Sequence, residues 1–192
     1  MQLTGKQIVE SGVITGYDTE HAVQQQGLDL RLDTVTRLGE FTQWNGTCGF
    51  LGRGWIPAKG KTELPIARTE MELHTAMPEE YPSREYSGTP YFALAPGYYE
   101  ITMLEGCKIP DNLVISNIKS RSSLVRCGAE IVCGQFDAGF ETKNIGCFLR
   151  VSLPICIEHG ARIGQVQVFE TAPVSKENLY NGQWQHDKQR TV

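Results

Sequence analysis

The stretch Tyr91-Phe92-Ala93-Leu94-Ala95-Pro96-Gly97-Tyr98-Tyr99-Glu100-Ile101-Thr102-Met103 decides the fold. It contains two short β-prone runs that a Pro-Gly turn separates, a pattern typical of two successive short strands. Similar runs continue to residue 169, with Ile-Pro-Asp and His-Gly turns between them. Several short strands at such regular spacing indicate an all-β sandwich or barrel. We predict strands at residues 91–94, 98–103, 113–118, 129–133, 146–153 and 163–169.

The N-terminal part of the chain predicts one helix and one further strand. Residues 4–12 have a Thr cap and a terminal Gly, as a short helix does. Residues 27–32 alternate apolar and polar side chains, the period-two pattern of a strand. Residues 39–90 contain Gly-rich and Pro-containing pieces, and we expect hairpins and long loops there. A chain of 192 residues is long enough to bury a core, so we expect a single domain over residues 1–192.

The composition argues against several classes of protein. The net charge is -4 with a pI of about 5.6, and the basic residues are dispersed, which disfavours binding to nucleic acid. No apolar run approaches the ~20 residues that span a bilayer. The first residues lack the basic and apolar layout of a signal peptide. We therefore expect a cytoplasmic protein with no nucleic-acid partner and no membrane partner.

The six cysteines stand at positions 48, 107, 127, 133, 147 and 156. None of them forms a C-x-x-C pair, so a zinc site is not supported. Without zinc, the usual metal-hydroxide route to base deamination is missing. The last four cysteines fall in apolar, strand-like segments, and we predict buried, reduced thiols there.

Residues 120–128 (SRSSLVRCG) form the first candidate binding segment. Arg121 and Arg126 supply two guanidiniums that can fork onto phosphate oxygens, and Ser122 and Ser123 supply hydroxyls for the remaining acceptors. Such a set suits a triphosphate. Surface or interface ion pairs are the alternative role for the two arginines, and the interleaved serines favour phosphate binding.

Residues 136–140 (FDAGF) form the second candidate segment. The Asp137 carboxylate could orient and deprotonate a water molecule, while an aromatic ring packs against a sugar. An Asp in this context is also a common turn residue, and Phe140 is equally well explained as a core residue. A phosphate-binding segment close to a potential base is the minimum requirement for nucleotide hydrolysis.

These two segments belong to an ordered series that spans nearly the whole chain. The other members are residues 3–8 with 12–14, 26–32, 94–99 with 109–113, 160–166 and 180–185. In this order they resemble the dCTP deaminase branch of the trimeric dUTPase superfamily. The resemblance implies a dUTPase-like distorted β-barrel or jelly roll with a short N-terminal helix. It also implies a homotrimer whose active sites lie at subunit interfaces.

The resemblance further implies that each site takes dUTP or dCTP, with Mg²⁺ on the phosphates. Asp137 would position the attacking water, and Phe140 would pack under the deoxyribose. Asp29 would act structurally or reach the metal through water, because Mg²⁺ keeps most of its hydration shell. The candidate catalytic residues are Asp137, Ser122 and Arg126, and the candidate substrate-binding residues are Arg121, Ser123, Phe136, Phe140, Gln165, Tyr180 and Gln185.

The C-terminal residues 177–192 are polar, with Tyr180 and Trp184 among them. The two rings could be simple apolar anchors for a frayed tail. The similarity to the deaminase-branch flap favours a segment that orders over a bound nucleotide.

The sequence departs from the deaminase pattern at its central residue. Deaminases of the branch carry a glutamate ten residues beyond the motif-three aspartate, and Cys147 stands there in this chain. A thiol with an ordinary pKa near 8.5 is a poor proton shuttle at neutral pH. The connection between Gly128 and Asp137 is also shorter than is usual in the branch, and Thr142 replaces a usual glycine.

Three functions therefore stay open on the sequence. The first is a homotrimeric, Mg²⁺-dependent enzyme that splits dUTP into dUMP and pyrophosphate, which needs only the phosphate contacts and Asp137. The second is a dCTP deaminase, alone or combined with dUTP hydrolysis. The third is a catalytically silent trimer that binds nucleotides, regulates a partner or has a structural role.

Overall fold

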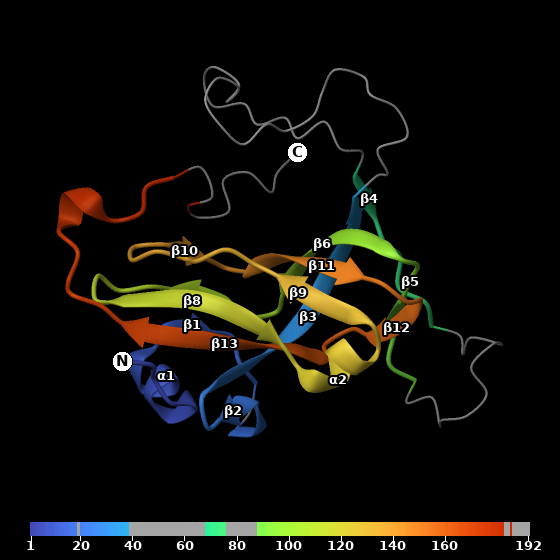
Figure 1. Ribbon diagram of the computed structural model, residues 1–192, viewed down its shortest axis with the longest axis horizontal. Coiled ribbons are helices and arrows are strands. Elements are labelled where there is room, and N and C mark those ends of the chain that lie inside the picture. The colour runs from blue at the N-terminus through green and yellow to red at the C-terminus, as the bar shows by residue number, and fades with distance from the viewer. Residues whose placement is uncertain (19, 39–67, 76–87, 183–184, 186–192) are drawn as a thin grey trace, which may run out of the picture.

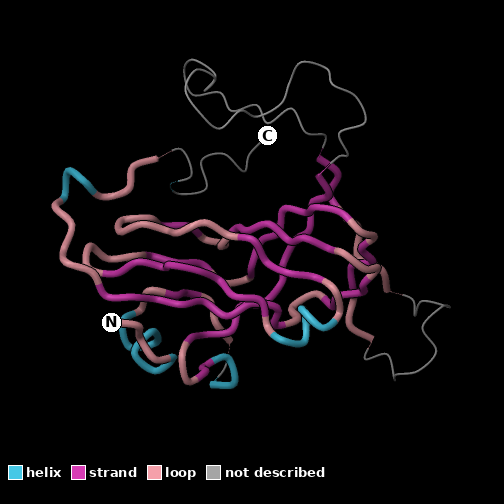
Figure 2. The backbone as a smooth tube through the Cα atoms, viewed as in Figure 1, coloured by secondary structure: helices cyan, strands magenta, loops and turns pink. Residues whose placement is uncertain are grey.

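The computed structural model describes residues 1–18, 20–38, 68–75, 88–182 and 185 (Figure 1). The chain folds as an all-β structure with a short N-terminal helix, which confirms the predicted fold class. Strands dominate the tube representation, and the helices lie at its periphery (Figure 2). No described helix has the length and apolar character needed to cross a bilayer. Most of the hairpins and loops predicted for residues 39–90 lie outside the described residues.

The largest sheet is antiparallel along its whole path and nearly closes into a barrel. Its two end strands approach each other, and the backbone N–H of Ile131 donates a hydrogen bond to Ser120 Oγ at 2.7 Å across the gap. A side chain thus replaces the backbone ladder where the barrel closes. The path runs β8 (Leu113–Ser120), β13 (Arg162–Glu170), β3 (Gly27–Leu38), β6 (Gly97–Met103), β11 (Gly146–Val151) and β9 (Ala129–Val132).

Shorter strands extend this framework. Two of them pair with β3, namely β2 (Val23–Gln24) and β4 (Arg68–Glu70). A three-stranded sheet consists of β1 (Ile14–Thr15), β7 (Gly106–Lys108) and β10 (Glu141–Thr142). A two-stranded sheet pairs β12 (Ile155–Glu158) with β5 (Tyr91–Leu94). The remaining elements are helices α1 (Gly5–Ser11) and α2 (Ser122–Arg126) and the 3₁₀ turns η1 (Glu20–Ala22) and η2 (Lys176–Asn178).

Helix α1 has the capping signals that its sequence predicts. Thr4 caps its N-terminus in a reciprocal capping box with Gln7, and Gly12 ends it in the left-handed conformation at φ 66°. The helix is short, so most of its stability comes from packing. Ile8 is completely buried against the barrel.

The predicted strands are confirmed, and several features differ from expectation. Strand β3 runs six residues beyond the predicted end at residue 32, because its far part pairs with β4 and β6. The short strands β7 and β12 and helix α2 lack a long periodic signal and were not predicted. The prediction of buried thiols is wrong for Cys127 and Cys156, which are exposed; Cys147 is buried and Cys133 half-buried.

The barrel interior is filled by alternate residues of neighbouring strands. Tyr99, Ile101 and Met103 of β6 are fully buried, while the residues between them are partly accessible. Strand β11 follows the same rule with Cys147 and Leu149 on its inward face. The period-two alternation of these strands therefore fixes which side chains form the core.

One charged pair lies within this framework. Glu105 is completely buried, and Arg31 donates to it from its backbone N–H at 2.8 Å and from Nε at 2.6 Å. The rest of the guanidinium donates to Asp18 Oδ2 at 2.8 Å and to the Gly16 carbonyl at 2.9 Å. The pair connects β3 to the turn between β6 and β7. The Arg31 guanidinium compensates the buried negative charge of Glu105.

We expect Arg31→Ala to destabilise the fold by about 3–5 kcal/mol, because it leaves a buried carboxylate unpaired. Lys6→Ala is the matched control, since Lys6 pairs with Glu10 across an exposed turn of α1 and such pairs are worth about 0.3–0.5 kcal/mol. Urea unfolding of both variants measures the difference. Equal losses of stability would show that the Arg31–Glu105 pair has no special structural role.

Candidate active site

The candidate residues fall into two groups in the structure. The first, which we call the α2 cluster, surrounds the N-terminal end of helix α2. The second, the loop cluster, surrounds the loop between β9 and β10. The α2 cluster contains Asp29, Arg121, Ser122, Ser123, Arg126 and Gln165, and the loop cluster contains Phe136, Asp137, Phe140, Tyr180 and Gln185.

Strand pairing assembles the centre of the α2 cluster. Gln165 of β13 lies opposite Asp29 of β3, and Arg121 follows directly after β8, the other neighbour of β13. Arg121 Nε lies 3.4 Å from Asp29 Oδ2, and Arg121 Nη1 donates to the Arg162 carbonyl at 3.3 Å. The backbone N–H of Arg121 donates to the Ile163 carbonyl. These contacts hold the guanidinium beside Asp29 while part of it stays accessible to solvent.

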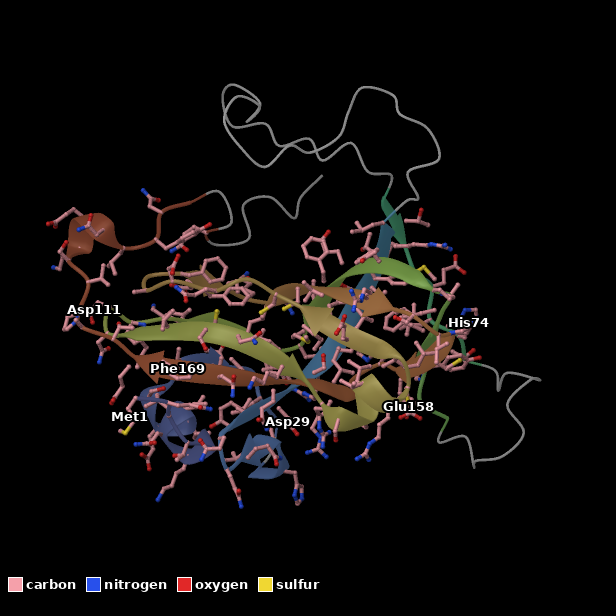
Figure 3. All side chains as sticks on the ribbon, in the orientation of Figure 1. Met1, Asp29, His74, Asp111, Glu158 and Phe169 are labelled. Atoms are coloured by element: carbon pink, nitrogen blue, oxygen red, sulfur yellow. The ribbon has the colours of Figure 1, made fainter. Side chains whose placement is uncertain are left out.

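Asp29, which is labelled in Figure 3, is a buried carboxylate in an electrostatically unfavourable environment. Its side chain is only 1% exposed, and neither oxygen has a hydrogen-bond partner of good geometry among the described residues. Burial raises the pKa of Asp29; the Arg121 charge, the Gln165 amide opposite and the Arg162 charge lower the pKa without cancelling the rise. The Gln165 amide thus approaches the carboxylate but does not complete a hydrogen bond. Asp29 therefore has unused acceptor capacity next to Arg121.

Three further side chains of the α2 cluster are available to a ligand. Ser122, Ser123 and Arg126 are exposed, and no hydrogen bond or ion pair joins their side chains to another described residue. These two hydroxyls and one guanidinium, which have no partner in the described part of the chain, can together with Arg121 bind the oxygens of a phosphate chain.

The loop cluster presents one carboxylate and three aromatic rings. Asp137 is exposed, and Gln135 Nε2 donates to its Oδ1 at 2.8 Å, which restricts the carboxylate's orientation. Phe140 is buried between two rings, with centroid distances of 5.4 Å to Phe136 and 5.2 Å to Tyr180. In this conformation Phe140 packs as a core residue does. The ring of Tyr180, from the C-terminal tail, covers one side of Phe140.

The C-terminal segment docks on the same loop. Tyr180 donates its backbone N–H to the Ala138 carbonyl at 2.8 Å. Gln185 donates from Nε2 to the Gly139 carbonyl at 2.8 Å and accepts from the Glu141 N–H at 3.1 Å. Gly139 has φ 88°, and a Cβ there would meet Leu179 Cβ at 2.8 Å, so only glycine permits this approach. The Gln185 amide is thus used on the loop cluster, and Trp184 lies outside the described residues.

The two clusters lie far apart within one chain. Phe136 forms a bridge with Ile115 near one end of β8, whereas Arg121 follows Ser120 at the other end. Five residues of extended strand span about 17 Å. Figure 1 accordingly shows α2 and β10, which follows the loop, on opposite sides of the molecule. Asp137 and the arginines of one chain therefore do not face the same phosphate.

The carboxylates near the two clusters determine how a Mg²⁺ ion could be held. The described part of the chain contains no group of three or more His, Cys, Asp or Glu side chains that could hold a metal ion. Asp29 supplies the carboxylate of the α2 cluster, and its buried oxygens lack hydrogen-bond partners among the described residues. This set fits an ion held mainly by phosphates and water, with at most one carboxylate nearby, a common arrangement for Mg²⁺.

Two residues near the clusters were missed from the sequence. Gln135 contacts the Asp137 carboxylate, but an amide two residues before an aspartate carries no recognisable signal. Arg162 affects the pKa of Asp29 and anchors Arg121 through its carbonyl. It lies in the segment at residues 160–166, so its place in the ordered series was the available clue.

Comparison with known proteins gives a consistent family. A family model described as dCTP deaminase-like matches residues 4–171. Probable deoxyuridine 5'-triphosphate nucleotidohydrolases are similar over most of their length. The protein from Halobacterium salinarum is 28% identical over 88% of this chain and 86% of its own length. The protein from Aeropyrum pernix is 26% identical over 96% of this chain and 98% of its own length.

A solved structure agrees in fold. The 2'-deoxycytidine 5'-triphosphate deaminase from Agrobacterium tumefaciens superposes with a TM-score of 0.54 at 14% sequence identity. The match covers 89% of this chain and 48% of the deaminase chain, so this chain spans about half the length of that protein. At this identity the likeness concerns the fold alone.

The electrostatics of Asp29 predict an unusual stability profile. Since the folded-state pKa is raised, the folded protein binds more protons than the unfolded chain between the two pKa values, and stability falls as pH rises through that window. We expect Asp29→Asn to raise the Tm at neutral pH, with a gain that shrinks as pH falls toward the ordinary value of 3.8. Thermal unfolding across this pH range measures the gain.

Asp111→Asn is the matched control for this experiment, because Asp111 is an exposed carboxylate in the turn before β8. It should leave the Tm nearly unchanged at every pH. A lower Tm for Asp29→Asn at neutral pH would contradict the prediction and would show that the charged pair with Arg121 outweighs the desolvation of Asp29.

Proposed function

Because the chain belongs to the dCTP deaminase-like family, we propose that it hydrolyses dUTP to dUMP and pyrophosphate. The family lies within the dCTP deaminase and dUTPase superfamily of enzymes, whose members act in pyrimidine deoxynucleotide metabolism. Relatives named as probable dUTP nucleotidohydrolases cover nearly all of this chain, which supports the hydrolytic member of the pair.

Cys147 is the observation that carries the choice of hydrolysis over deamination. It occupies the position where the resemblance expects the proton-shuttling glutamate. Its side chain is buried, and the neighbouring group is the thiol of Cys133. Hydrolysis of the phosphate chain does not need that glutamate, whereas it does need the anion-binding side chains and a base, which this chain has kept.

The roles of the residues follow from their surroundings. Water attacks the α-phosphorus of dUTP, Asp137 accepts the proton of that water, and pyrophosphate leaves with the electrons of the broken P–O bond. Arg121, Arg126 and the serines hold the phosphate oxygens and offset the charge that develops on them. When bound, Mg²⁺ would add charge neutralisation on the phosphates. Tyr180 covers Phe140, so the tail has to shift before that ring can pack against a deoxyribose.

The separation of the clusters supports a site shared between copies of the chain. One copy would supply the α2 cluster and a neighbouring copy the loop cluster, and a closed ring of three copies is the assembly that the family resemblance implies. Exposed apolar side chains on β6, β9 and β11 are consistent with self-association. They include Tyr98, Val132 and Phe148, and Phe148 lies opposite Val132 in the strand register.

Product analysis tests the activity directly. The purified protein with Mg²⁺ is incubated separately with dUTP and with dCTP, and dUMP, pyrophosphate and ammonia are measured. We expect dUMP and pyrophosphate from dUTP and no reaction with dCTP. Asp137→Asn should lower kcat by about 10²- to 10⁴-fold with little change in KM, the usual range for loss of a general base. Glu10→Gln, which changes an exposed carboxylate on α1, should keep full activity.

Other outcomes would point to the other functions. Ammonia released from dCTP would show a deaminase, and would mean that another group does the work of the missing glutamate. No turnover of either nucleotide would favour a silent protein, and nucleotide binding measured by calorimetry would then separate a sensor from a structural protein.

A mixed assembly tests whether the site is shared. Asp137→Asn and Arg126→Ala chains, each inactive or nearly so, are co-expressed with different tags and purified through both. If the site lies between copies of a closed trimer, one of the three sites in each mixed trimer contains two intact halves, so activity returns to about a third of the wild-type value. Activity no higher than that of the separate variants, or a monomer by light scattering, would rule out the shared site.

A further inference from the structure

Strand pairing sets two cysteines opposite each other on the inner face of the barrel. Phe148 lies opposite Val132 and Leu149 opposite Ile131 in the β11–β9 register. Extending this register by one residue sets Cys147 opposite Cys133. Opposed residues in antiparallel strands have Cα atoms about 4.5–5.5 Å apart. That separation lies within the range of about 4.4–6.8 Å that a disulfide spans.

The side chains of the two cysteines lie within hydrogen-bonding reach of each other. Both cysteines are free thiols, and the Cys147 thiol donates a hydrogen bond to the Cys133 sulfur. The backbone N–H of Ile118 donates a second hydrogen bond to this sulfur at 3.3 Å. Bond formation between the two residues therefore needs rotation of side chains rather than movement of strands.

The two thiols differ in access and in reactivity. Cys147 is buried, whereas Cys133 is half-buried at the point where β9 ends. The hydrogen bond from Cys147 lowers the pKa of Cys133 to about 7, against the effect of burial and with help from the Ile118 N–H. The thiolate is the nucleophilic form of cysteine, so Cys133 is the member of the pair that an oxidant meets first.

We propose that Cys133 and Cys147 are a peroxide-sensitive modification site, which closes into a reversible disulfide. The Cys133 thiolate attacks hydrogen peroxide, takes one oxygen as a sulfenic acid and releases hydroxide. The Cys147 thiol then attacks the Cys133 sulfur, the S–S bond forms, and the sulfenic oxygen leaves as water. The net reaction consumes two thiols and one peroxide and yields one disulfide and two waters. A dithiol reductant reverses it.

The site is independent of the proposed nucleotide chemistry. It concerns groups on the inner face of β9 and β11, and neither sulfur is assigned a role in phosphate hydrolysis. The loop that carries Asp137 begins next to Cys133, so the disulfide would fasten the start of this loop to β11.

Peptide mapping of the full-length, reduced protein tests the proposal. The protein is treated with hydrogen peroxide at neutral pH, its remaining thiols are blocked with N-ethylmaleimide, and it is digested without reductant. We expect one linked peptide pair that contains Cys133 and Cys147, with a mass about 2 Da below the sum of its reduced peptides because two hydrogens leave. Before oxidation, Cys133 should react with iodoacetamide about tenfold faster than the exposed Cys127.

Matched variants distinguish this pair from general oxidation. Cys127→Ser and Cys156→Ser change exposed thiols and should keep the linked peptide, whereas Cys133→Ser should lose it. Cys147→Ala should stop the reaction at the sulfenic acid of Cys133, which dimedone traps, and circular dichroism confirms that this variant is folded. Recovery of Cys133 and Cys147 as separate blocked peptides after peroxide, or links of Cys133 mainly to other cysteines, would overturn the proposal.

Discussion

The pairing of Arg31 with the fully buried Glu105 determines where strand β3 lies. Glu105 accepts from both the backbone and the side chain of Arg31, so the pair holds the strand at this residue to the turn between β6 and β7, in addition to the backbone pairing with β13 and β6. Side chains two residues apart share one face of a strand, and Asp29 therefore points to the same side as Arg31. The pairing of β13 then sets Gln165 opposite Asp29 and leads to Arg121. The α2 cluster is in this sense a consequence of how one buried carboxylate is satisfied.

Asp29 is a second buried carboxylate, and its environment differs from that of Glu105. Glu105 accepts two hydrogen bonds from Arg31, whereas Asp29 is buried with a raised pKa and neither of its oxygens has a hydrogen-bond partner among the described residues. A fold selected for stability alone would not keep such a group. Its position beside Arg121 gives it a reason to persist, because a carboxylate there orients the guanidinium that we assign to phosphate binding. The loop cluster has no comparable buried charge, since Asp137 is exposed and accepts a hydrogen bond from Gln135, while the tail satisfies backbone groups of the loop.

The sequence was sufficient for the barrel and insufficient for the site. Strands such as β5 and β6 are predictable because alternation and turn residues are local signals, and Thr4 and Gly12 mark the ends of α1 for the same reason. The burial of Asp29 is not local, because β13 and Arg121 cover it from elsewhere in the chain. The exposure of Cys127 and Cys156 was missed because an apolar neighbourhood in sequence does not reveal which side of a strand or helix end faces solvent. The ordered motifs identified the site residues, but only the register of β8 shows that they divide into two distant clusters.

The departure from the deaminase pattern and the thiol pair have one structural origin. The register of β11 against β9 that brings Cys147 to the position expected for a glutamate also sets it opposite Cys133. A carboxylate at that position would have to be buried beside a thiol that carries partial negative charge near neutral pH, and two such groups disfavour each other's ionised form. A cysteine instead donates a hydrogen bond to that sulfur. Cys147 at this one strand position therefore accounts both for the departure from the deaminase pattern and for the thiol pair that we propose as a modification site, and the loop that carries Asp137 begins beside it.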